Sequence, residues 1–133
     1  MKLEILTLCH SADENSRNGI DIIAASDRVY GDIAPGKISR CVLFYRLRFD
    51  ATEAGNHDVS ISLIGDDGKS LMPPNKKQIA AKLKNEYSTC TNLGMVGLNG
   101  VLLPKFGEYS LDFFVDGVAI GSQPLYFEQT VLR

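Results

Sequence analysis

Apolar and polar residues alternate every second position along several segments of this chain. In the longest of these segments, residues 41–49, one face carries Cys41, Leu43, Tyr45, Leu47 and Phe49. A period of two is typical of a β-strand with one buried face. The same alternation predicts strands over 59–64, 109–115 and 118–127. A less regular alternation predicts further strands over 3–9, 20–30 and 89–103.

Turn signals separate these segments. The pairs Asp67-Gly68 and Asp116-Gly117 suit tight turns with positive φ, and the second pair joins the two last predicted strands into a hairpin. Glycines at 94, 97 and 100 indicate a bulge or a close backbone approach within 89–103. The stretch 76–84 alternates as a strand would but also contains good helix formers, and we favour a strand.

Seven or eight short strands without a long 3.6-residue pattern predict an all-β fold, an antiparallel two-sheet β-sandwich of immunoglobulin-like architecture. Tyr109 follows a glycine-containing turn at the start of a late strand. Its hydroxyl can bond to upstream backbone as a tyrosine corner, or the ring can be an ordinary core aromatic. The chain has no Trp and no suitably spaced Cys pair, which excludes an antibody-type domain.

Composition narrows the class of protein. The 133 residues are 44% hydrophobic and 23% charged with a net charge of −2, which predicts one globular domain over 1–133. A net charge near zero argues against the broad attraction to phosphate backbones that nucleic-acid binding needs, so we expect no nucleic-acid partner. No apolar run approaches about 20 residues, so we expect no membrane span. No secretory signal precedes the first strand, and we expect a cytoplasmic protein. Cys9, Cys41 and Cys90 are expected to be free, buried thiols.

Motifs for catalysis or metal binding are weak. Gly65 to Ser70 ends in Gly-Lys-Ser, but the first glycine of a phosphate-binding loop is missing and Pro73-Pro74 leaves no room for a helix. Neighbouring Cys9 and His10 would point to opposite faces of a strand, so they cannot share a metal ion. We therefore expect no enzyme activity, no cofactor and no metal.

Two sets of residues remain as candidate contact sites. Phe44 and Phe114 fall on the faces opposite the predicted core, where large apolar side chains often mark an interface. Arg46 and Arg48 can pair with acidic neighbours such as Asp112, or they can bind an anionic group. We predict a non-catalytic module that contacts another protein or a second copy of itself. Its interface is expected at Phe44, at Phe114 or along the 72–90 segment.

The alternative function is binding of a small ligand or carbohydrate in loops at one end of the sandwich. The loop predicted over 10–19 begins with His10, and a second loop contains Pro73 and Pro74. His57 lies in a turn that enters a strand. Binding residues tend to lie on such loops, because a rigid sheet can hold them in place.

Several segments together resemble a family of bacterial proteins of unknown function that form single β-sandwich domains. The resemblance rests on the opening Met1 to Cys9, on Ala24 to Tyr30, on Tyr45 to Phe49, and on the C-terminal half from Asn92 through Gly107-Glu108-Tyr109 to Tyr126. It also includes Gly55-x-His57-x-Val59 and Asp67-Gly68-Lys69 followed by Pro73-Pro74. The resemblance implies a β-sandwich fold and a cytoplasmic setting, and it implies no catalytic residue.

Overall fold

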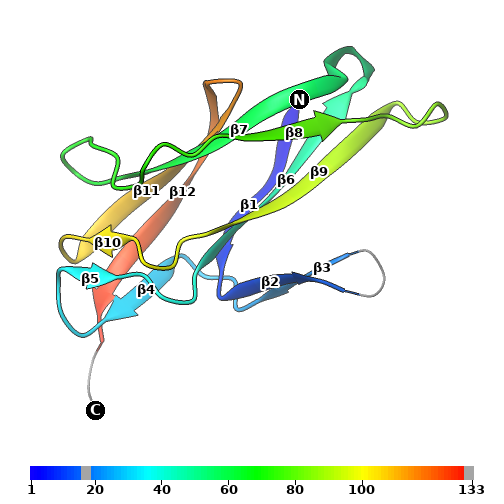
Figure 1. The fold of residues 1–133 in the computed structure, drawn as a ribbon. Coiled ribbons are helices and arrows are strands. Elements are labelled where there is room, and N and C mark those ends of the chain that lie inside the picture. The colour runs from blue at the N-terminus through cyan, green and yellow to red at the C-terminus, as the bar shows by residue number, and fades with distance from the viewer. Residues whose placement is uncertain (16–18, 131–133) are drawn as a thin grey trace.

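The computed structural model describes residues 1–15 and 19–130 (Figure 1). Within these residues the chain forms twelve strands and one 3-10 helix. Their bounds are β1 Lys2–Cys9, β2 Ser11–Glu14, β3 Ile20–Ile23, β4 Arg28–Gly31, β5 Gly36–Lys37, β6 Val42–Asp50, η1 Ala51–Glu53, β7 Gly55–Ile64, β8 Lys77–Ala81, β9 Thr89–Gly97, β10 Leu102–Leu103, β11 Gly107–Val115 and β12 Val118–Gln129. The part of the chain that the structure describes contains no helix that could span a membrane.

The described strands form two larger sheets and two short two-stranded ones. The first larger sheet has the order β1-β6-β9 and the second the order β4-β12-β11-β7-β8; the small ones are β10-β5 and β2-β3. All pairs are antiparallel except β4 with β12. The all-β class is confirmed. The predicted two-sheet sandwich of seven or eight strands is not confirmed in that form, because the short strands β2, β3, β5 and β10 form two further two-stranded sheets.

The alternating segments supply the core. Every inward position predicted on β6 is at most 6% exposed, and so are the inward positions of β7 and β11. These side chains form one apolar cluster that includes Leu43, Leu47, Phe49, Val59, Ile61, Leu63, Leu111, Phe113 and Val115. The cluster draws on both larger sheets, so it fixes how the two sheets lie against each other.

The turns follow their residue types. Asp116 and Gly117 have φ of 51° and 78° and close the β11–β12 hairpin, as predicted. Gly68 has a φ of 76° in the turn after β7. The Tyr109 hydroxyl donates to the Lys105 carbonyl over 2.5 Å and accepts from the Lys105 amide over 3.2 Å. This is the contact that the tyrosine-corner interpretation predicts.

The structure shows the conformation of the ambiguous segment 76–84 and the role of a glycine in the segment 89–103. Residues 77–81 form strand β8, because Ile79 and Ala81 alternate into the core at 7% and 2% exposed. Gly94 is a close backbone approach: a Cβ there would lie 2.2 Å from the buried Tyr45 ring. The loop predicted over 10–19 is corrected in part, since residues 11–14 form strand β2. β2 pairs with β3, which lies at the start of the strand predicted over 20–30. Residues 16–18 of that loop lie outside the described residues.

Candidate functional site

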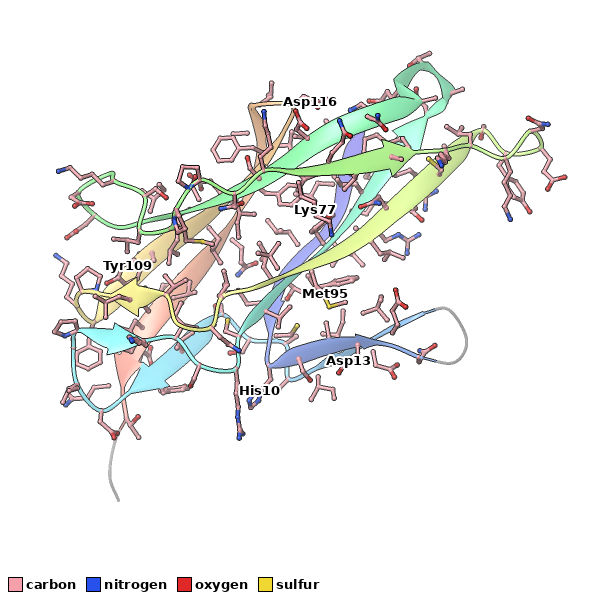
Figure 2. All side chains as sticks on the ribbon, in the orientation of Figure 1. His10, Asp13, Lys77, Met95, Tyr109 and Asp116 are labelled. Carbon is pink, nitrogen blue, oxygen red and sulfur yellow. The ribbon has the colours of Figure 1, made fainter. Side chains whose placement is uncertain are left out.

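The residues predicted to bind a small ligand do not lie together. His10 follows β1 at one end of the molecule, while His57 binds Asp116 in the β11–β12 turn at the other end (Figure 2). Pro73 and Pro74 are exposed in the connection between β7 and β8. A single site built from these four residues is therefore wrong, because the strands separate the loops that carry them.

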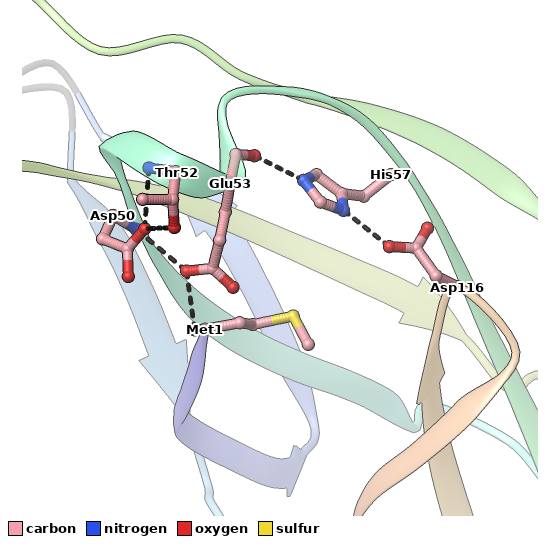
Figure 3. A network of polar contacts seen from close by, with 6 residues as sticks. All are labelled: Met1, Asp50, Thr52, Glu53, His57 and Asp116. Carbon is pink, nitrogen blue, oxygen red and sulfur yellow. Dashed lines mark hydrogen bonds and ion pairs between the residues drawn. The ribbon is translucent and has the colours of Figure 1, made fainter.

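His57 belongs to a polar network at the end of the molecule that carries the N-terminus (Figure 3). Its Nδ1 lies 2.7 Å from Asp116 Oδ2, and its Nε2 lies 2.6 Å from the Glu53 carbonyl oxygen. Both partners are acceptors, so only the doubly protonated imidazolium donates to both. The ring also stacks on Phe49 with centroids 4.7 Å apart. His57 thus ties the η1 turn to the β11–β12 hairpin.

Hydrogen bonds set the charges in this network. The Glu53 carbonyl and then the Asp116 carboxylate raise the pKa of His57 above its ordinary value, because both favour the charged ring. His57 in turn lowers the pKa of Asp116, whose other oxygen accepts from the Asp58 amide over 2.9 Å.

Residues of the same polar network cap η1. The Asp50 side chain accepts from the Thr52 amide, and Glu53 accepts from the Asp50 amide, which together make a capping box. The Met1 ammonium lies 2.6 Å from Glu53 Oε1. These contacts assign His57 a structural role rather than the predicted ligand-binding one.

Phe44 is corrected as an exposed interface residue. Alternation places it on the outer face of its sheet, but it is only 2% exposed. It packs with Cys9 and with Ala12 of β2, while Ile20 of β3 lies against the same small cluster. The β2–β3 hairpin covers this face. A strand is predicted over β3, but β2 lies in the predicted loop over 10–19, so the hairpin itself is not predicted from the sequence.

Phe114 and the two arginines remain on outer faces. Phe114 is half-buried on β11, where its cross-strand neighbours are the small residues Ser60 and Ala119. Arg46 and Arg48 lie on the other larger sheet and pair with Glu4, at 3.0 Å and 2.9 Å. The expected partner Asp112 is wrong, since it lies on the five-stranded sheet and accepts from Ser110. The two arginines act in structural ion pairs.

A groove of about 500 Å³ opens between the last strands of the two larger sheets. One side is formed by residues 74–77 and the other by residues 95–97. Tyr45, Val59 and Ile61 of the core line it as well, so its lining is largely apolar. Figure 2 labels Lys77 on β8 and Met95 on β9, the strands that flank the opening.

β9 presents an unusually open sheet edge to this groove. In the described part of the chain β9 pairs only with β6, in a register that runs without a bulge from Thr89 to Gly97. Its nine residues include no charge and no proline. Lysines, prolines and bulges are the devices that normally protect an edge strand from pairing with another chain. None of them is present on β9 itself.

Positive charge collects on the β8 side. Residues 76–84 contain four lysines and no acidic residue. Lys77 pairs with buried Val59, so its side chain points to the inner side of the sheet, at the groove. Lys76 is 3.6 Å from Asp58, whereas Lys77 forms no hydrogen bond or ion pair with a described residue. An unpaired ammonium at an apolar groove favours an acidic ligand.

Comparison with known proteins places the chain in a family. Its sequence matches a family of unknown function, DUF6941, over residues 4–128. The chain belongs to this family. The match extends from β1 to β12, so it covers nearly all of the described strands rather than one motif. No curated protein matches the chain.

The thiols of this family member are free. Cys9 and Cys41 are buried and Cys90 is partly exposed. Burial raises the pKa of Cys9 and raises that of Cys41 to about 11, so both thiols stay protonated at neutral pH. Within residues 1–15 and 19–130 no three His, Cys, Asp or Glu side chains are grouped to hold a metal ion.

The groove could not be predicted from the sequence, because it lies between β8 and β9. Only the order of strands in the two larger sheets brings these strands to its two sides. Two signals for it are nevertheless visible in the sequence. The segment 89–97 has neither charge nor proline, and the segment 76–84 carries its lysines without acidic residues. Either signal alone is compatible with an ordinary strand; the fold places them on opposite sides of one opening.

Proposed function

We propose that this protein is a non-catalytic interaction module that binds an extended, acidic segment of a partner protein along β9. The observation that carries the proposal is the nine-residue unprotected edge of β9 beside the groove. An extended peptide can add to such an edge through main-chain hydrogen bonds, while alternate side chains enter neighbouring pockets. The proposed interface keeps the predicted 72–90 segment, adds β9 and drops the buried Phe44.

Charge decides between a partner and a second copy of this chain. A second copy would bring its own lysine-rich 76–84 segment and no acidic residue from that segment, so like charges would meet. A partner segment with an Asp or Glu opposite Lys77 would gain an ion pair at the rim of an apolar groove. Apolar residues at every second position of that segment would contact the groove lining.

Selection from a library of random octapeptides tests the proposal. We expect enriched peptides to alternate apolar and acidic residues. Lys77→Glu is expected to weaken their binding by about tenfold or more, since loss of an ion pair adds like-charge repulsion. Lys69→Glu, which makes the same charge change in an exposed turn, serves as the matched control and should bind as the wild type does.

Two outcomes would contradict the proposal. Equal binding by wild type and Lys77→Glu would remove the groove as the docking site. A dimer in native mass spectrometry that dissociates when the selected peptide is added would make a second copy of the chain the occupant.

Two further proposals concern the architecture of the protein and its cellular setting. We propose an immunoglobulin-like relationship for the two larger sheets, supported by their eight strands and by the Tyr109 hydroxyl bonded to the Lys105 backbone. We also propose a cytoplasmic setting, supported by three cysteines that remain unpaired.

A further inference from the structure

A second opening lies near His10, away from the groove. It is a cleft of about 390 Å³ between the end of β1, the start of β4 and the residues before β6. Its polar lining comes from His10, Ser26, Arg28, Tyr30, Ser39 and Arg40. The volume is at the lower end of the range for small-molecule sites, about 300 to 1,000 Å³.

The His and Arg side chains that line this cleft are all of the basic type. Two arginines and a histidine line it, and no carboxylate does. The Arg28 guanidinium also forms ion pairs with the carboxylates of Glu128, at 2.8 Å, and Asp27, at 3.6 Å. The side chains of His10 and Arg40 form no hydrogen bond or ion pair with a described residue. Their donors are therefore available to an anion.

The backbone of the cleft is strained where it presents these groups. Arg40 has a φ of 51° and Ala24, also in the lining, has a φ of 55°. Side chains other than Asn and Asp rarely adopt this left-handed conformation, and glycine adopts it freely. The fold thus carries an arginine at a position where glycine would fit better. Strain of this kind is concentrated at binding sites.

We propose that this cleft binds a phosphate monoester of a small molecule. The phosphate oxygens would accept from Arg40, Arg28 and the Ser39 hydroxyl, the donor types that suit this group. The organic part would lie against Tyr30, whose ring is 58% exposed. This site does not depend on the proposed peptide groove, because the two openings share no lining residue.

Heteronuclear NMR titration of the full chain tests the site with adenosine monophosphate, glucose 6-phosphate, inorganic phosphate and adenosine. We expect both monoesters to shift amide signals of residues 8–10, 24–30 and 39–41 and to bind more tightly than inorganic phosphate. Adenosine should leave the signals unchanged. If no cleft signal moves at millimolar monoester, or if adenosine shifts the same signals, the proposal fails.

Arg40→Gly separates binding from folding. It removes one donor and also the left-handed strain, so we expect monoester affinity to fall about tenfold while the melting temperature stays equal or rises. Lys84→Gly, which removes the same charge from an exposed position outside the cleft, should keep wild-type affinity. Unchanged affinity in Arg40→Gly, or an equal loss in Lys84→Gly, would overturn the assignment.

Discussion

The His57 network makes a prediction about how stability depends on pH. Both ring nitrogens face acceptors, at 2.7 Å and 2.6 Å, so the complete network needs the imidazolium. Since folding raises the pKa of His57, the extra stability is fully present below the unfolded value of about 6.5 and disappears as the pH rises through the folded value. The unfolding free energy should therefore fall between pH 6 and pH 9.

The size of the effect follows from the contacts. A hydrogen bond to a charged group contributes about 1.5 to 3 kcal/mol when shielded from water. The His57 side chain is 16% exposed and that of Asp116 is 51% exposed, which places the pair at the low end of that range. We expect His57→Phe, which keeps the stacking on Phe49, to cost about 1.5 kcal/mol at pH 6 and about 0.5 kcal/mol at pH 9.

Urea unfolding of wild type and His57→Phe at both pH values measures this difference. Asp116→Asn is the matched control, because Asn tolerates the left-handed φ of 51° and can still accept from the Asp58 amide while losing the charge. It should reduce the pH dependence without unfolding the hairpin. Two results would contradict the stabilisation by protonated His57. One is a cost of His57→Phe that is equal at pH 6 and pH 9, and the other is an NMR titration of His57 centred at or below 6.5.

Five further substitutions test the packing. Gly94→Ala should cost about 3 kcal/mol in urea unfolding because its Cβ meets a buried ring, while Gly97→Ala, with open space on the same strand, should cost less than about 0.5 kcal/mol. Phe44→Ala should cost about 3 kcal/mol and half-buried Phe114→Ala about 1 kcal/mol; equal costs would contradict the burial by the β2–β3 hairpin. Tyr109→Phe should cost about 1 kcal/mol through its two backbone bonds, and no loss would remove the corner's structural role.

The long strands could be predicted from the sequence because burial of one face imposes its own period. β6, β7, β11 and β12 all follow that rule. The turns at Gly68 and Gly117 could be predicted for a different reason, because Asp-Gly pairs favour the positive φ found there. The short strands β2, β3, β5 and β10 have two to four residues each, too few for a period to fix their bounds. β3 and β10 therefore appear in the predictions only as parts of longer strands over 20–30 and 89–103. They form because tertiary packing holds them, as Phe44 holds the β2–β3 hairpin.

The candidate sites were predicted less well, because they join residues far apart in the chain. His57 meets Asp116, 59 residues away, and its pattern in the sequence is only that of a turn. For Arg46 and Arg48 the sequence left open an ion pair or the binding of an anionic group. They form ion pairs, and their partner Glu4 comes from β1 through the strand register. Residue type can indicate what a side chain does, while the sheet order decides which partner it meets.

Hydrogen exchange along β9 is the most direct test of the proposed function. The selected acidic peptide is added to the protein, and amide exchange is followed residue by residue with and without it. We expect slower exchange at residues 89–97 and 74–77, since new main-chain bonds would cover the free edge of β9. Unchanged exchange in β9 with protection confined to another surface would contradict it.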